Sequence, residues 1–325
     1  MNPATLRDRL EGGQIAIYFA AVVLGAIIAL LVPGTASWED AINPALALML
    51  FVTFLQVPLA ELGRAFGKVR FLGALVATNF IVVPLLVALL IPFAPANPLV
   101  RLGVLLVLLC PCIDYVVTFA HLGRADAKLL LASTPVLLVV QMLLLPLYLR
   151  LFLGADASRL VQPGPFLHAF LWLIVVPLAL AIVVQLWARR GGAGERASTL
   201  LGLLPVPATA LVLLIVIAAV MPQLGQALPA ALGVMPIYVA FAIAAPLLGW
   251  AVSRVAKLDA ESGRALAFSA ATRNSLVVLP LALAVPGAVP LLPAIIVAQT
   301  LVELVAELVF IRALPRLGSA TPVVA

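Results

Sequence analysis

Uninterrupted apolar runs of about 20 residues recur along almost the whole chain. As a helix, a run of that length crosses about 30 Å of hydrocarbon. Apolar residues make up 65% of the 325 positions and charged residues only 10%, whereas a soluble domain carries about 25% charged residues. An outer-membrane barrel would instead show alternating segments of roughly 10 residues. The sequence therefore predicts an all-α polytopic membrane protein that lies in a lipid bilayer.

Ten spans can be delimited, joined by connections too short to hold a soluble domain. They cover residues 14–33, 42–60, 71–95, 99–121, 127–153, 164–188, 198–220, 232–254, 262–285 and 289–312. If the N-terminus is inside, 15 of the 19 basic residues lie on the cytoplasmic side. Cytoplasmic loops carry an excess of Lys and Arg. We therefore expect a protein of the plasma (inner) membrane with both termini cytoplasmic.

Five spans in each half of the chain imply two halves of opposite orientation. We expect one transmembrane domain built from two inverted repeats, residues 1–162 and 163–325. A Pro-x5-Gln pattern that begins at Pro135 recurs 158 residues later at Pro293, and the same offset places Tyr115 opposite Arg273. Chance similarity between apolar segments is the alternative explanation for this match.

Two polar interruptions fall in spans that should run unbroken, each near the fourth span of its own half. They read Cys110-Pro111-Cys112-Ile113-Asp114 and Thr272-Arg273-Asn274-Ser275. Paired interruptions at matching places indicate the binding site of a transporter. Pro111 removes a backbone donor, so the carbonyls of residues 107–110 need another partner or a water-filled cavity. We expect spans 4 and 9 to be discontinuous.

The ionisable residues at these breaks are the main candidates for chemistry. An isolated charge at this depth costs several kcal/mol, so Arg273 needs an anionic partner, either a substrate or one of Asp114, Glu303 and Glu307. A static clasp that only joins two spans is the structural alternative. Glu303 and Glu307 lie four residues apart and share one helix face, but Glu307 is nearer the cytoplasmic end and is expected to face water.

Other polar residues in the spans have plainer explanations. A thiol is a soft ligand for thiophilic species, yet Cys110 and Cys112 are equally explained as small buried residues beside a kink. Interhelical hydrogen bonds account for Asn79, Gln141 and Gln299. No metal-ligand cluster, cofactor motif, nucleophile–base pair or phosphate-binding loop occurs, so we expect neither an enzyme nor an ATP-driven pump. The basic residues form no patch, which excludes a nucleic-acid partner despite the net charge of +6.

The run from Cys112 to Asp126 resembles the span-4 motif of arsenite-efflux transporters, which opens with Cys-Ile. These transporters belong to the bile acid/arsenite/riboflavin transporter superfamily. The likeness extends to residues 79–84 of span 3 and to Gln141 and Tyr148 of span 5. Arg273-Asn274-Ser275 is similar to the Gln-Asn-Ser of the sodium–bile-acid branch. The resemblance implies a panel domain and a core domain, with spans 4 and 9 crossing at the substrate site, and it implies that Cys112 is the thiol that arsenite exporters require.

Two departures from the family pattern bear on coupling. The arsenite exporters carry a glutamate in span 9 where this chain has Leu276, so Glu303 of span 10 is expected to substitute for it. The sodium-coupled branch has a glutamate where this chain has Ser269 and a glutamine where it has Arg273. A fixed guanidinium there would stand where a sodium ion otherwise binds, which favours protons as the coupling ion.

The leading expectation is a secondary transporter that exports arsenite or antimonite, driven by the proton gradient. In this interpretation Cys112 contacts the metalloid, with Thr272 and Cys110 as secondary candidates. Asp114, Arg273 and Glu303 form the charge relay, while Asn274 and Ser275 line the crossover. The rival is a sodium- or proton-coupled carrier of a small organic anion, in which Arg273 clamps a carboxylate. A membrane sensor or scaffold without transport is the third class.

Overall fold

The computed structural model describes residues 3–56, 67–113, 115–154, 164, 167–168, 171–283 and 285–318. Within these ranges the chain is helical and contains no strand, apart from a single β-bridge between Pro111 and Arg273. Six of the described segments are long and apolar enough to cross a membrane, and a bent helix pair would make a seventh. They are Thr5–Leu31, Thr35–Leu55, Val69–Phe93, Ala127–Leu153, Ala227–Val255 and Leu291–Arg316. The protein is therefore a multi-pass membrane protein, and the plan of ten spans in two inverted repeats stays a prediction.

The chain forms two compact units, and each unit takes segments from both halves of the sequence. Unit 1 contains Met1–Leu59, Ser158–Ala231 and Leu276–Val297. Unit 2 contains Ala60–Ala157, Leu232–Ser275 and Ala298–Ala325. Compact units and sequence repeats are different divisions, so the repeats 1–162 and 163–325 remain expectations.

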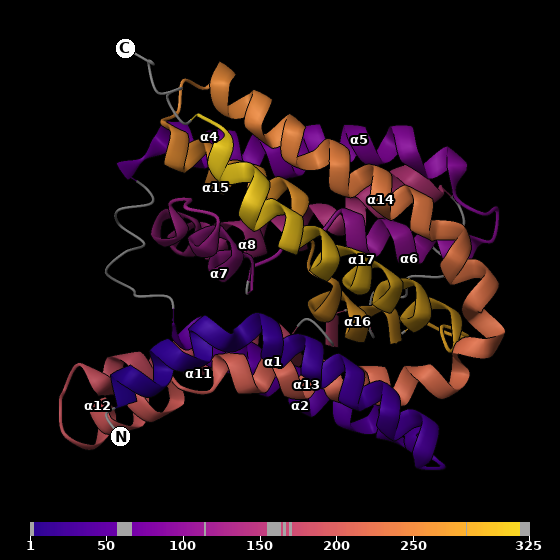
Figure 1. Cartoon of the computed structure of the whole chain (residues 1–325), viewed down its shortest axis with the longest axis horizontal. Helices are drawn as coiled ribbons and strands as arrows, with labels where there is room; N and C mark the ends of the chain where they lie inside the picture. The colour runs from indigo at the N-terminus through magenta and orange to yellow at the C-terminus, as the bar shows by residue number, and fades with distance from the viewer. Residues whose placement is uncertain are drawn as a thin grey trace. The chain divides into compact units, whose positions relative to one another are not determined.

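Unit 1 is built on a layer of long helices. They are α1 (Pro3–Leu31), α2 (Glu39–Leu55), α11 (Val176–Ala188) and α13 (Pro205–Val220). Helix α13 lies between α1 and α2, and α11 packs on α2 (Figure 1). A Cβ at Gly25 would lie 2.7 Å from the carbonyl oxygen of Leu214, so α1 and α13 approach each other through a small residue, as membrane helices commonly do.

One predicted boundary in unit 1 is wrong. The span expected at 198–220 begins at Pro205, because residues 198–201 belong to the separate helix α12 (Ala193–Leu201). The two helices meet at 45° across Gly202–Leu204. Proline suits the first turn of a helix, where its missing N–H costs no hydrogen bond, and this fixes the start of α13.

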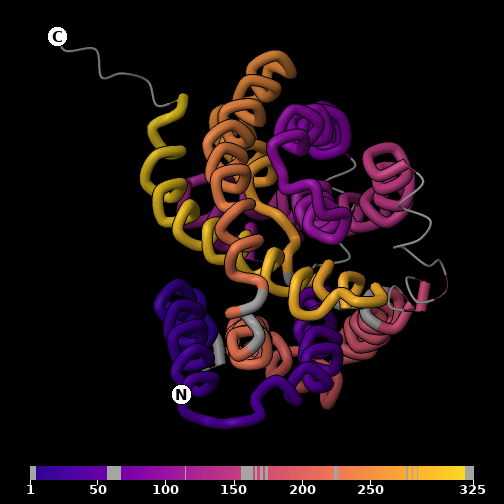
Figure 2. The backbone as a smooth tube through the Cα atoms, turned by 90° about the vertical axis from the view of Figure 1, so that its right-hand side faces the viewer, coloured from indigo at the N-terminus to yellow at the C-terminus, as the bar shows by residue number. Residues whose placement is uncertain are grey.

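Unit 2 holds both of the predicted breaks. Its helices are α4 (Val69–Ala77), α5 (Val83–Leu90), α6 (Pro98–Leu108), α7 (Val116–Leu122), α8 (Ala127–Leu153), α15 (Ala260–Ala271), and most of α14 (Leu224–Val255) and α17 (Leu291–Ala313). A π-helical turn, η2 (Thr78–Val82), joins α4 to α5. Such turns occur mostly at functional sites. Helix α17 runs beside α14 (Figure 2), and Gly249 brings α14 close to α15, since a Cβ there would lie 2.9 Å from the carbonyl oxygen of Leu266.

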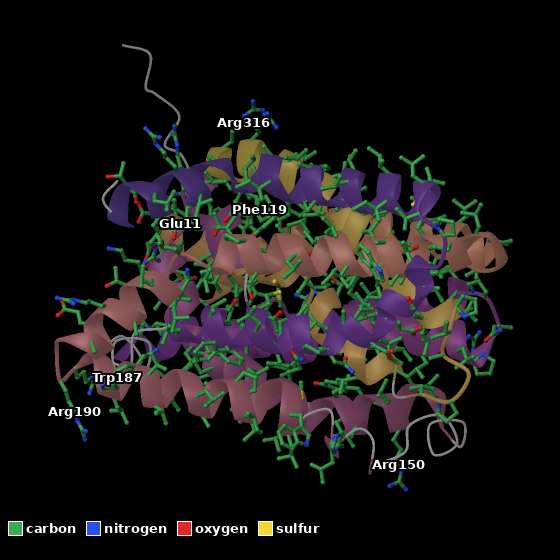
Figure 3. All side chains as sticks on the ribbon, turned by 90° about the horizontal axis from the view of Figure 1, so that it is seen from below. Glu11, Phe119, Arg150, Trp187, Arg190 and Arg316 are labelled. Carbon is green, nitrogen blue, oxygen red and sulfur yellow. The ribbon has the colours of Figure 1, made fainter. Side chains whose placement is uncertain are left out.

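Side chains in unit 2 sort by depth as a membrane domain requires. Phe119 is fully buried, whereas Arg150 and Arg316 project outward near the ends of α8 and α17 (Figure 3). Exposed apolar residues such as Leu143 and Val305 lie along the middle of the same helices. Charged groups at helix ends and bare apolar sides in between match contact with lipid.

Candidate functional site

Two helical breaks meet inside unit 2, at a point that we call the crossing. Helix α6 ends at Leu108 and α7 begins at Val116, while α15 ends at Ala271 and α16 (Ser275–Leu283) follows after three residues. The N–H of Cys112 donates to the carbonyl oxygen of Thr272 at 3.1 Å, and the N–H of Asn274 donates to that of Cys110 at 2.8 Å. These two bonds make the bridge between Pro111 and Arg273. The unwound segments thus satisfy each other's backbone groups, which a membrane interior requires.

Arg273 lies at the centre of this crossing and is 0% exposed. Its Nη2 donates to Asn79 Oδ1 at 2.9 Å, to the carbonyl oxygen of Ala270 at 2.8 Å and to that of Ser269. Its Nη1 reaches the carbonyl oxygen of Leu108 at 3.4 Å. The carbonyl of Leu108 has no helical donor, because the N–H of Cys112 donates to Thr272 instead, and the guanidinium takes that donor's place. None of these four acceptors is a carboxylate.

Glu303, on α17, binds the backbone of the crossing instead of the guanidinium. Its Oε2 accepts the N–H of Arg273 at 2.7 Å and the amide of Gln299 at 2.5 Å. Its Oε1 accepts the hydroxyl of Tyr115. Three donors converge on a side chain that is only 3% exposed, an arrangement that fits an ionised carboxylate. Among the carboxyl partners considered for Arg273, Glu303 therefore binds its backbone N–H.

Glu307 does not face water, and that expectation is wrong. Its side chain is 0% exposed and accepts the hydroxyl of Thr272 at 2.6 Å. Its second oxygen, Oε2, is buried and has no hydrogen-bond partner among the described residues. Because Glu303 and Glu307 lie one helical turn apart, both carboxyls reach consecutive residues of the same break.

The remaining candidates divide between the crossing and other places. Cys110 and Cys112 form no disulfide and have no exposed surface. Ser275 Oγ accepts the hydroxyl of Thr300 at 2.9 Å, and Asn274 is buried next to it. These residues come together at the crossing.

One further candidate, Asp114, lies outside the described residues. Gln141 is buried in α8, and neither atom of its amide has a hydrogen-bond partner in the part of the chain that the structure describes. Its place in the site therefore stays a prediction.

Sequence reasoning missed two members of the network. Ser269 accepts the amide of Asn79 through its hydroxyl at 3.0 Å, and it lies one helical turn before Arg273, which is a signal for a shared face. The Tyr115 hydroxyl contacts Glu303 and lies 3.4 Å from the carbonyl oxygen of Arg273. The 158-residue offset had already set Tyr115 opposite Arg273.

A small cavity adjoins the carboxyl of Glu303. It has a volume of about 10 Å³ and is bordered by Gln299, Glu303, Tyr238 and Phe241 among others. This volume is near the minimum for one water molecule. The Oε1 of Gln299 is buried without a partner among the described residues and would be an acceptor for such a water. The cavity therefore has room for about one water molecule beside Glu303.

Comparison with known proteins gives one family and no individual relative. The model of the Sodium Bile acid symporter family matches residues 43–230, which is more than half of the chain. No curated protein matches the sequence significantly. The match covers the first break, at residues 110–114, and agrees with the superfamily that the sequence resembles, without selecting its arsenite-efflux branch. By this match the chain belongs to the sodium bile acid symporter family.

Proposed function

We propose that this transporter exports arsenite or antimonite in exchange for protons. The observation that carries the proposal is one peptide group, between Thr272 and Arg273. Its carbonyl accepts the N–H of Cys112 at 3.1 Å, and its N–H donates to Glu303 at 2.7 Å. A thiol-bearing residue and a titratable carboxyl therefore hold opposite ends of the same rigid unit.

The substrate class follows from the thiols. Arsenite, as As(OH)3, reacts with a thiol by exchanging one hydroxyl for sulfur, and the hydroxyl leaves as water with the thiol's proton. Soft thiolate ligands select such thiophilic species. Cys112 lies in the unwound segment, where the backbone is held by Thr272 instead of by its own helix. A small shift of this segment would move the thiol toward or away from a bound metalloid.

Proton coupling follows from the bonds of Glu303. An ionised carboxylate accepts bonds from Tyr115, Gln299 and the Arg273 backbone. A protonated carboxyl carries a donor of its own and is a weaker acceptor, so proton binding weakens these three bonds. The two protonation states thus prefer different geometries at the crossing, which is the condition for an ion to shift a conformational equilibrium.

Arsenite uptake into everted membrane vesicles tests the proposal, because uptake there corresponds to export from the cell. We expect uptake in the wild type that an uncoupler abolishes. Cys112→Ser and Glu303→Gln should each lower the rate at least about tenfold, equivalent to about 1.4 kcal/mol. Cys110→Ser and the exposed-site Glu195→Gln serve as matched controls with a smaller effect.

Two results would contradict the proposal. One is uncoupler-insensitive arsenite uptake, and the other is full uptake by Cys112→Ser. If arsenite is not carried at all by correctly inserted protein, while an organic acid is, the organic-anion interpretation replaces it.

A further inference from the structure

The family's name implies a sodium ion as co-substrate, and the residues around Arg273 test whether this chain can bind one. Four oxygens surround the end of the Arg273 side chain in unit 2: the carbonyls of Leu108, Ser269 and Ala270, and the amide oxygen of Asn79. The three carbonyls belong to the last residues of α6 and α15. Helix C-termini carry partial negative charge, and the carbonyls of interrupted helices coordinate sodium in membrane transporters. The oxygens themselves therefore suit a hard monovalent cation.

The space between these oxygens is already filled by a cation. The Arg273 guanidinium contacts all four of them and is 0% exposed. The ring of Phe241 closes another side, with its centroid 5.4 Å from the guanidinium carbon. A guanidinium does not lose its proton in proteins, so the positive charge is permanent. A sodium ion does not fit while the arginine is in place, because it would meet a like charge and would find its ligands taken.

We propose that the Arg273 guanidinium is a tethered cation that takes the place of a sodium ion, and that a shorter side chain at this position uncovers a working sodium site. This rests on the proposed function only in treating the crossing as the coupling site. The inference explains how a member of a family named for sodium symport can transport its substrate without sodium. It also assigns Asn79 a specific role, because Asn79 supplies the one side-chain oxygen among these four, which we call the cage.

Thermal melting of purified protein tests this without any flux measurement. Wild type, Arg273→Ala and Arg273→Lys are melted in detergent with sodium, potassium or choline chloride at equal ionic strength. The melting temperature of the wild type should be the same in all three salts, and so should that of Arg273→Lys. Arg273→Ala should melt lower in choline and recover in sodium, by about 5 °C or more when sodium exceeds its dissociation constant about 100-fold.

A second variant keeps the test decisive if Arg273→Ala is hard to fold. Arg273→Gln leaves a neutral side chain that is shorter than arginine but longer than alanine, and it should also gain a sodium response. Adding Asn79→Leu to either variant should remove that response, because it deletes one of the four oxygens. Sodium-specific stabilisation of the wild type would overturn the inference, as would a folded Arg273→Ala and a folded Arg273→Gln that ignore sodium.

These outcomes are separate from those of the arsenite assay. Absence of arsenite transport leaves the melting result unchanged, because no substrate is present. Conversely, if Arg273→Ala and Arg273→Gln show no response to sodium, the tethered-cation proposal is refuted, but the proposed coupling between Cys112 and Glu303 is not affected.

Discussion

Asn79 supports the crossing from a separate helix, and replacing it with leucine should lower stability measurably. Its Nδ2 donates to Ser269 Oγ at 3.0 Å and to the carbonyl oxygen of Leu75 at 3.1 Å, and its Oδ1 accepts from Arg273 at 2.9 Å. The side chain is 0% exposed. Leucine has nearly the same size and shape but forms none of these bonds. The substitution therefore removes hydrogen bonds without opening a cavity.

The expected cost comes from the bonds to Arg273 and Ser269. A hydrogen bond to a charged group contributes about 1.5–3 kcal/mol, and a neutral one about 1 kcal/mol. The Leu75 carbonyl belongs to the same helical turn, so we assign no loss to it. Asn79→Leu should then destabilise the protein by about 3 kcal/mol, which lowers the melting temperature by roughly 6–12 °C at about 2–4 °C per kcal/mol.

Melting of the purified protein in detergent, followed by tryptophan fluorescence, measures this shift. Asn43→Leu is the matched control, since Asn43 is exposed on α2, and it should change stability by no more than about 0.5 kcal/mol. If Asn79→Leu and the wild type have the same melting temperature, the guanidinium does not depend on the Asn79 amide. The assignment of Asn79 as a ligand of the guanidinium would then be refuted.

Two other predictions concern the break at residues 272–274 and the start of α15. Thr272→Val leaves the buried Glu307 without its hydroxyl donor, so it should lower stability by about 1–3 kcal/mol, and Thr272→Ser should restore most of it. Burial raises the pKa of Asp259, but bonds from the N–H and hydroxyl of Ser262 outweigh it and hold that pKa below 3.8. Such a group stabilises the folded state above its unfolded pKa and loses this effect as the pH falls through the folded value. Asp259→Ala should therefore cost about 1 kcal/mol at pH 7 as a lost helix cap, and the difference from wild type should shrink in melting curves as the pH falls below 3.8, the ordinary pKa of an aspartate.

The breaks themselves were predictable because their signals are local. Pro111 cannot continue a helix without leaving a carbonyl free, and Arg273 cannot face lipid. Both statements depend on a few adjacent residues, and the helices indeed end at Leu108 and Ala271. The start of α13 could not be predicted in this way. The hydrophobic run continues through the bend at residues 202–204, so no local change in the sequence marks the bend.

The partners of Arg273 were harder to predict, because side-chain patterns do not display backbone acceptors. The sequence offered three carboxyl residues as candidates, yet the guanidinium contacts three carbonyls and one amide. Glu307 illustrates a different error. Its spacing from Glu303 places both residues on one helix face, whereas its position near the helix end predicts exposure to water. The structure shows that Glu307 is buried on the same face as Glu303.

We propose that protons, not sodium ions, drive a metalloid through this crossing. Purified protein in liposomes with an acidic interior, in sodium-free buffer, measures it directly through accumulation of arsenite. If protons are the coupling ion, arsenite accumulation should follow the pH gradient and should not change when sodium is added on either side. It should disappear in Glu303→Gln. Accumulation that requires a sodium gradient and ignores the pH gradient would contradict it.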